Sequence, residues 1–179
     1  MKNKLLFMML TILGEPIATA TNYDLARSEY NFAVNELSKS SFNQAAIIGQ
    51  VGTDNSARVR HEGSKLLSVI SQERGGNNRA KVDQAGNYNF AYIEQTGNAN
   101  DASISQSAYG NSAAISAAII QKGSGNKANI TQYGTQKTAV VVQKQSHMAI
   151  QANITQYGTQ KTAVVVQKQS HMAIRVTQR

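Results

Sequence analysis

The sequence predicts an all-β protein, a β-solenoid in which 22-residue strand–turn–strand layers stack in a cross-β arrangement. Three observations support this fold class. The stretch ANITQYGTQKTAVVVQKQSHMAI occurs letter for letter at 128–150 and 152–174. Glutamines recur with an 11-residue spacing, and within each unit fixed residue types alternate with variable ones. A stack of like units tolerates a verbatim copy, because the copy only adds a layer.

The recurring glutamine follows an aliphatic residue by two positions, and His61 occupies one place in the series. Eight of the eleven steps equal this spacing; the longer steps are 72 to 84, 106 to 121 and 143 to 156. We attribute them to an extra residue at Arg74, to the tandem tetrapeptide SAAI at 112–119, and to the offset of 24 between the copies. These exceptions indicate small insertions into an 11-residue frame.

Each unit reads Q-x-G-x-x-N-x-A-x-[IV]-x-Q. From Asn to the closing Gln the fixed positions alternate, so in a strand they share one face, which we expect to be buried. The Gly-rich segment between strands has the composition of a tight turn, with glycines at Gly52, Gly63, Gly86, Gly97, Gly123, Gly134 and Gly158. The expected ladder and core residues are Gln44, Gln50, Asn55, Ala57, Gln72, Asn78, Gln84, Asn89, Ala91, Ile93, Gln95, Asn100, Ala102, Ile104, Gln106, Asn111, Gln121, Asn126, Ala128, Ile130 and Gln132.

About six such layers are expected. Ala and Ile or Val would pack between two sheets, while Asn and Gln side chains hydrogen-bond to their equivalents about 4.8 Å above and below. The same period also suits a right-handed coiled coil. Glycine in every unit and the missing heptad leucines disfavour that alternative.

Residues 1–20 have the layout of a secretory signal peptide, with Lys2 and Lys4 before an apolar run from Leu5 to Leu13. Cleavage is expected between Ala20 and Thr21. A membrane anchor is the weaker alternative, because the apolar run is about half the length that spans a bilayer. The repeat region extends over 41–179, and residues 21–40 lie outside its frame.

Charge is distributed unevenly, and the chain contains no cysteine, so disulfides are excluded. Residues 21–101 hold eight Lys or Arg and nine Asp or Glu, whereas 102–179 hold eight Lys or Arg and no acidic residue. The basic half is either a solvated face or a docking surface for an acidic partner protein or a membrane surface.

From about residue 133 the layers become degenerate and basic. Lysines at 137 and 161 stand where the frame has Asn, and glutamines at 145 and 169 stand where it has turn Gly. These layers are either frayed or used for docking; the docking candidates are Lys137, Lys144, Lys161, Lys168, Arg175 and Arg179.

Nothing in the sequence predicts an enzyme. The carboxylates are scattered, and His147 and His171 are copies of one another without further residues at metal-ligand spacing. We therefore predict no catalytic residues, no metal site and no cofactor. Nucleic acid is not expected as a partner, because aromatic residues are sparse in the basic half.

The Q-x-G-x-x-N-x-A-x-x-x-Q units, the leader MKNKLLFMMLTILG, the segment YDLARSEYNFAVNELSKSSFNQAAIIGQ and the ending HMAIRVTQR resemble the curlins. Curlins are the subunits of amyloid fibres on Gram-negative bacterial surfaces. The chain looks like the type of subunit that nucleates the fibre, and its basic half fits an acidic major subunit.

The resemblance implies a secreted, cell-surface protein without enzymatic activity. It would leave through the curli export channel, with 21–40 as export-targeting segment, and be held by a surface-anchoring accessory factor. It would nucleate polymerisation of the major curlin subunit through an open strand edge, supporting adhesion and biofilm. The alternatives are a bulk fibre subunit and a non-amyloid β-solenoid adhesin. About one layer beyond the family's five repeats, the SAAI doubling and the early irregularities depart from the family pattern.

Overall fold

The computed structural model describes residues 17–21 and 43–179, apart from 109, 111–113, 145–149 and 169–170. The described residues form strands and turns, with no helix among them. The strands wind into a β-solenoid, so the expected fold class is confirmed. No helix within the described part of the chain is long and apolar enough to cross a membrane.

The strands are short in the first layers and long in the duplicated region. Their bounds are β1 Ile17–Thr21, β2 Gln44–Gln50, β3 Ser56–Ser64, β4 Leu66–Glu73, β5 Arg79–Asn87, β6 Asn89–Thr96, β7 Asp101–Ser107, β8 Ile115–Lys122, β9 Lys127–Lys144, β10 Gln151–Gln167 and β11 Ala173–Gln178. β9 and β10 continue through a bend, so each contributes to both faces of the solenoid.

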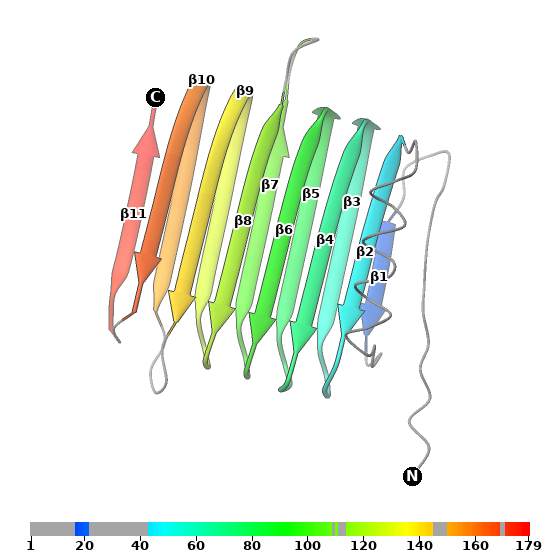
Figure 1. Cartoon of the computed structure of the whole chain (residues 1–179), viewed down its shortest axis with the longest axis vertical. Coiled ribbons are helices and arrows are strands. Elements are labelled where there is room, and N and C mark those ends of the chain that lie inside the picture. The colour runs from blue at the N-terminus through cyan, green and yellow to red at the C-terminus, as the bar shows by residue number, and fades with distance from the viewer. Residues whose placement is uncertain (1–16, 22–42, 109, 111–113, 145–149, 169–170) are drawn as a thin grey trace.

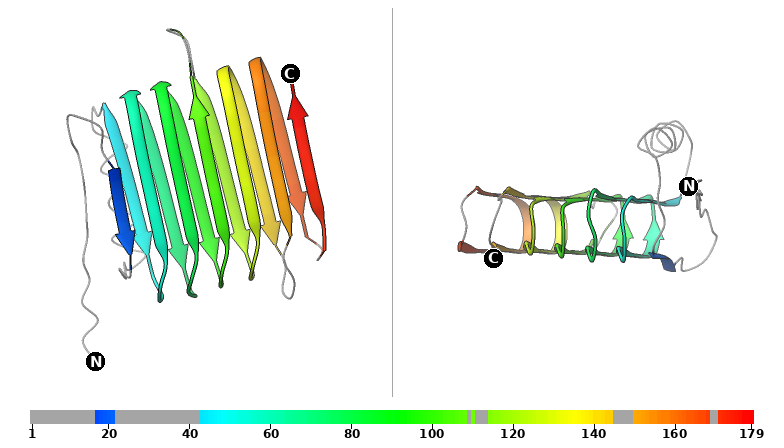
Figure 2. Two further views of the ribbon diagram at one scale, coloured as in Figure 1. Left: turned by 180° about the vertical axis from the view of Figure 1, so that it is seen from behind. Right: turned by 90° about the horizontal axis from the view of Figure 1, so that it is seen from below.

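Two parallel stacks of strands face each other (Figures 1 and 2). The first contains β2, β4, β6, β8 and the later halves of β9 and β10. The second contains β3, β5, β7, the earlier halves of β9 and β10, and β11. The solenoid makes about five turns, close to the about six layers expected from the sequence.

Every stacked pair is in register with the frame predicted from the sequence. Gln50 lies opposite Gln72, and Gln72 opposite Gln95. Arg74 adopts a φ of 53° just after β4, and β8 begins at Ile115, which pairs with Asn89. The strand pairings on both sides of these positions therefore keep the predicted frame.

The bends require glycine because successive layers approach closely there. Gly86 has a φ of 94°, and a Cβ added to it would lie 1.9 Å from the carbonyl oxygen of Ala108 in the next layer. Two residues later Tyr88 also has a positive φ, 58°. This pairing recurs at Gly134 and Gln136, with φ of 114° and 51°. At these two bends the backbone therefore adopts the left-handed conformations that glycine tolerates best.

The core lies between the two stacks and consists of small and branched side chains in columns. It contains Ala57, Val59, Ile70, Ala80, Val82, Ala91, Ile93, Ala102, Ile104, Ala117, Ile119, Ala128, Ile130, Ala139, Val141, Ala152, Ile154, Ala163 and Val165. Because alternate residues face inward, the strands bury one face and leave the other to solvent over most of their length.

β1 is the exception to the parallel arrangement. It pairs antiparallel with β3, with Ile17 opposite Arg60 and Thr21 opposite Ser56. Four of its five residues belong to the segment that the sequence predicts as signal peptide. The boundaries at residues 20 and 40 remain predictions, since 1–16 and 22–42 lie outside the described residues.

Candidate assembly surface

Two ladders of glutamine side chains run through the core along the axis of the stack. In the first, amide Nε2 atoms donate to the Oε1 atom of the next rung over 2.5 to 2.9 Å. In the second the distances are 2.7 to 3.0 Å. The rungs are Gln50, Gln72, Gln95, Gln121, Gln143 and Gln167 in the first ladder, and Gln84, Gln106, Gln132, Gln156 and Gln178 in the second.

The second amide hydrogen of a rung is also used. Gln72 Nε2 donates to the carbonyl oxygen of Ser56 at 3.1 Å, and Gln95 Nε2 does the same to Arg79 at 2.9 Å. Buried amides are costly unless their hydrogen bonds are made, and here the neighbouring layers make them. Each layer therefore needs a like layer on both sides.

A column of asparagines follows one of the two bends. Asn78 Nδ2 donates to Asn55 Oδ1 at 3.0 Å and to the carbonyl oxygen of Gly97 at 2.7 Å. Asn100 repeats the pattern with Asn78 and Gly123, at 3.1 and 2.9 Å. The column continues to Asn126, whose backbone N–H donates to Asn100 Oδ1.

The asparagine column does not extend to the last layers. Ile150 takes the next position, because Lys127 N–H donates to its carbonyl as Asp101 N–H does to that of Asn126. Met172 follows in the same way.

The other bend has a mixed column. The expected ladder residue Asn111 lies outside the described residues, and Ile115, fully buried, stands opposite Asn89 instead. Lys137 follows Ile115, and Lys161 follows Lys137. Gln44 is half-buried, and its amide donates to the carbonyl oxygen of Gly63 rather than to a ladder rung.

Lys137 is 1% exposed, although it is a docking candidate in the sequence. Its ammonium donates to the carbonyl oxygens of Tyr133, at 2.5 Å, and of Gly158 in the next layer. Asparagine makes the same two kinds of bond, to a carbonyl four residues earlier and to the glycine carbonyl of the next layer. Lys137 thus substitutes for asparagine, which corrects the expectation that its charge lies at the surface.

Burial lowers the pKa of Lys137, and the nearby charge of Lys161 lowers it further. Lys161 is half-buried at the corresponding position of the last layer. The mixed column therefore contains one buried lysine, Lys137, and its copy Lys161 is only half-buried in the last layer.

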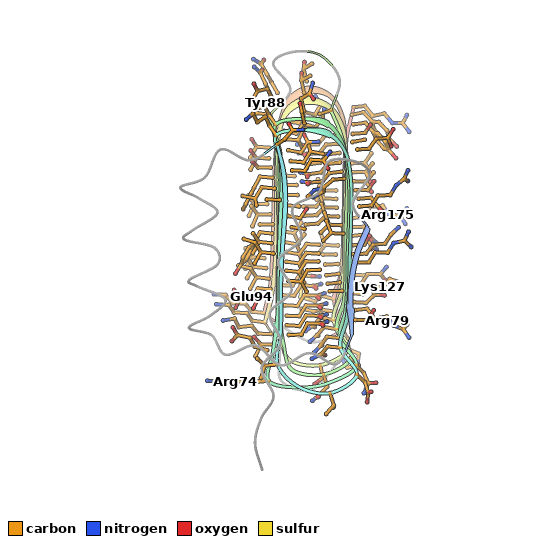
Figure 3. All side chains as sticks on the ribbon, turned by 90° about the vertical axis from the view of Figure 1, so that its right-hand side faces the viewer. Arg74, Arg79, Tyr88, Glu94, Lys127 and Arg175 are labelled. Atoms are coloured by element: carbon orange, nitrogen blue, oxygen red, sulfur yellow. The ribbon has the colours of Figure 1, made fainter. Side chains whose placement is uncertain are left out.

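The remaining docking candidates are accessible: Lys144, Lys168, Arg175 and Arg179 are exposed. Arg175 and Arg179 line an open groove with Asn153 and Tyr157. Figure 3 shows Arg79, Lys127 and Arg175 projecting from the outer face of one stack and Glu94 from the other. Lys122 pairs with Glu94 at 3.4 Å, whereas no acidic residue follows Asp101 in the sequence.

His61 takes the first position of the second ladder and is fully buried. Its Nε2 lies 2.7 Å from Ser68 Oγ, and the Ser68 hydroxyl donates to Gln84 Oε1 at 3.0 Å. The pair thus bridges the core to the next rung. Burial lowers the pKa of His61 to about 4, so the ring is neutral near pH 7.

Sequence reasoning treats His61 as an irregularity and misses Ser68. The sequence does contain a signal for Ser68: it interrupts a column that otherwise consists of alanines at 46, 91, 117, 139 and 163. A polar residue in an alanine column next to a substituted rung indicates a compensating pair.

The two ends of the stack carry unpaired strand edges. Among the described strands, β2 pairs only with β4, and β11 only with β10. At the β2 and β3 end, Gln50 Oε1 and His61 Nδ1 are buried and accept no hydrogen bond from any residue that the structure describes. Chemically the ends offer backbone amides and ladder side chains; no group of three or more His, Cys, Asp or Glu in the described chain could hold a metal ion.

The fold and its glutamine ladders define a β-solenoid built from stacked repeats. Comparisons of the sequence with known proteins indicate which kind of repeat it is. The family model described as "Curlin associated repeat" matches residues 75–107 and 97–134. Curated proteins named "Minor curlin subunit" match at 96% identity over 69 residues in Salmonella typhimurium and at 82% over 68 residues in Escherichia coli K12. The matches cover 38% and 37% of this chain.

The chain spans somewhat less than half the length of these relatives, 46% and 45%. No solved structure matches it significantly. The resemblance to the curlins is confirmed: residues 75–134 carry curlin-associated repeats, and the chain is similar in part to minor curlin subunits.

Proposed function

We propose that this chain is a curli component that nucleates polymerisation of the major curlin subunit. The observation that carries the proposal is the pair of open ends on an in-register ladder: among the described residues, each end lacks the like layer that interior layers have on both sides. An incoming curlin strand with the same Gln spacing supplies it by β-augmentation. Because the added layer presents a similar edge, growth repeats without any covalent chemistry, and the protein is not an enzyme.

The proposal includes the setting implied by the resemblance. The chain is secreted through the curli export channel with 21–40 as targeting segment, and an accessory factor holds it at the cell surface. The exposed cations Lys144, Lys168, Arg175 and Arg179 support docking there, because no acidic residue in 102–179 neutralises them. Adhesion and biofilm are the expected consequences of the fibres.

The test is a seeding assay. Trace amounts of the purified chain are added to soluble major curlin, and thioflavin fluorescence reports the lag time. We expect a sharply shortened lag. An unchanged lag, while the chain readily forms fibres alone, would instead favour a bulk fibre subunit; an unchanged lag without such fibres would favour an adhesin.

Proline variants test whether the shortened lag depends on the open strand edges. Val51 N–H donates to Gln72 O at 2.7 Å, so by alternation the peptide group of Ala46 faces away from β4. Lys137 N–H donates back to the carbonyl oxygen of Ala114, and β10 repeats β9 in register, so by the same alternation the peptide group of Val164 faces away from β9. Ala46→Pro with Val164→Pro removes two outward N–H donors and should restore a long lag. Ala46→Ser with Val164→Thr keeps the donors and serves as the control.

A further inference from the structure

We propose that Tyr133 and Tyr157 form an oxidative modification site, at which a one-electron oxidant of the peroxidase class joins the two phenol rings by a carbon–carbon bond into a dityrosine. The bond fastens β10 covalently to β9. The inference goes beyond nucleation, because it concerns how two layers of one chain are held together once they have stacked.

The two rings lie against each other on the outer face of one stack. β9 and β10 are parallel, and Tyr157 pairs with Tyr133 in a register that places identical residues opposite each other. The ring centroids are 5.5 Å apart, and the ring planes are inclined by 11°. This is the offset stacking that aromatic pairs favour. The backbone pairing of the strands therefore holds the two phenols side by side, so they need not meet by diffusion.

Both rings are accessible and have room to turn. Tyr133 is 38% exposed and Tyr157 is 42% exposed. Tyr157 also lines the open groove that contains Arg175 and Arg179. The torsion about the Cβ–Cγ bond of a tyrosine is broad, so an exposed ring can rotate out of the stack until the carbons beside the two hydroxyls meet. The site thus admits an oxidant and can reach the geometry of the product.

The site arises from the internal copy. Both tyrosines belong to the stretch that occurs at 128–150 and again at 152–174. On the other side of Tyr133 the paired residue is Ser107 of β7, and the described pairing of β10 with β11 ends at Gln178, opposite Gln156. Among the described residues, the column therefore contains two tyrosines and no third, and coupling stops after one bond.

The reaction balances with an oxidant that accepts one electron at a time, such as a peroxidase supplied with hydrogen peroxide. Each phenol gives up one electron and one proton and becomes a phenoxyl radical, whose unpaired electron is shared with the carbons beside the oxygen. One such carbon from each ring forms the new bond. Each of these carbons then loses its hydrogen as a proton, and each oxygen takes up a proton. In sum, two electrons and two protons leave the pair and reduce one hydrogen peroxide to two waters.

The composition of the chain favours coupling over quenching. Tryptophan and cysteine side chains readily pass an electron to a tyrosyl radical and so remove it. The chain contains neither residue. A radical formed on Tyr133 or Tyr157 therefore persists long enough for the neighbouring phenol to be oxidised in turn.

The test is peroxidase oxidation of the dilute full chain, with its β-structure verified by circular dichroism, followed by denaturation, trypsin digestion and mass spectrometry. Cleavage after lysine places Tyr133 in the peptide 128–137 and Tyr157 in the longer peptide 145–161, so the two copies are distinguishable. We expect these two peptides to be joined, with a mass two hydrogens below their sum. The oxidised chain should show dityrosine fluorescence and still migrate as a monomer on a denaturing gel.

Phenylalanine variants provide matched controls, because they keep the ring and remove only the phenol. Tyr133→Phe or Tyr157→Phe should lower the fluorescence of the monomer band at least about tenfold, since the remaining tyrosine lacks a partner held beside it. Tyr88→Phe removes a more exposed tyrosine, 56% exposed, and should leave the yield unchanged. A mixture of Tyr133→Phe and Tyr157→Phe chains carries both tyrosines on different copies and should give almost no joined peptides.

The absence of the joined peptides from the oxidised parent chain would overturn the site. A yield from the mixture equal to that of the parent chain would do so as well, because the coupling would then occur between copies. The oxidised parent should also unfold at a higher urea concentration than oxidised Tyr157→Phe, since the bond constrains the unfolded chain. Equal midpoints would show that the bond does not fasten the two layers. The seeding assay uses the unoxidised chain, so its outcome is independent of these results.

Discussion

His61 Nε2 and Ser68 Oγ meet across the core at 2.7 Å, although each side chain occupies a position that other layers give to Gln or Ala. The two substitutions depend on each other. Without the hydroxyl the buried imidazole would lose its partner, and without the imidazole the hydroxyl would have no donor. Together they replace one rung of a ladder without changing its direction.

Ser68→Ala should therefore destabilise the fold by about 1–3 kcal/mol, because it leaves His61 Nε2–H without an acceptor inside the core. His61→Gln with Ser68→Ala restores the composition of an ordinary layer and should recover most of the loss. Urea denaturation followed by circular dichroism measures both. Additive effects of the two substitutions would contradict the pairing.

Stability should depend on pH through His61. Its pKa falls from about 6.5 in the unfolded chain to about 4 in the folded one, so the unfolded state binds the proton more readily. The stability is complete above pH 6.5, is lost as the pH falls from 6.5 towards 4, and changes no further below that. The shift corresponds to about 3 kcal/mol. Carboxylates titrate as well, so the relevant quantity is the difference from His61→Gln, which should lack this component; parallel pH profiles would contradict it.

The verbatim copies provide a matched pair of lysines. Lys137 is buried between layers, whereas Lys161 is half-buried in the last one. Lys137→Asn keeps the two carbonyl contacts and removes a buried charge, so we expect it to stabilise the chain by about 1 kcal/mol or more, and Lys161→Asn to change little. Lys137→Met, which leaves both carbonyls without a donor, should destabilise. Thermal unfolding compares the three variants, and equal effects at 137 and 161 would refute the assignment.

The burial of Lys137 also predicts that the folding stability depends on pH in the alkaline range. Its pKa is lowered in the folded chain by burial and by Lys161, so the unfolded state holds the proton more tightly. Stability should rise as the pH increases through the folded pKa towards the unfolded value, and this rise should be missing in Lys137→Asn. Denaturation midpoints at successive alkaline pH values measure it.

Two glycines in identical sequence surroundings differ in the layer that covers them. A Cβ on Gly134 would lie 2.1 Å from the carbonyl oxygen of Gly158, while a Cβ on Gly158 would meet only Lys161 Cε, 3.9 Å away. Gly134→Ala should cost about 3 kcal/mol or more, and Gly158→Ala only the backbone strain of about 1–2 kcal/mol. Chemical denaturation of both variants is the measurement. A similar cost at both sites would mean that the layers do not stack as described.

Much of the fold follows from periodicity alone. An 11-residue frame with alternating fixed positions determines which residues face inward, and a strand shifted by one residue would bury its variable face. Gln72, Ile93 and Asn100 are buried for that reason. The alternation also explains why Arg74 and the SAAI repeat can be recognised as insertions from the sequence.

The features that escape prediction depend on contacts between units. The sequence places Lys137 at the surface because a charge is costly inside a protein, and only the carbonyls of Tyr133 and Gly158 make its burial possible. Ser68 becomes informative only with His61 opposite it. The pairing of β1 with β3 joins a segment outside the frame to one inside it, so no repeat pattern could indicate it.

The identity of each residue of β10 from 152 onward with its partner in β9 has a consequence for the gene. A recombination event that adds or removes a whole layer joins faces that already fit, and it requires no compensating substitution elsewhere. The number of layers can therefore change in whole steps while the fold of every remaining layer stays the same.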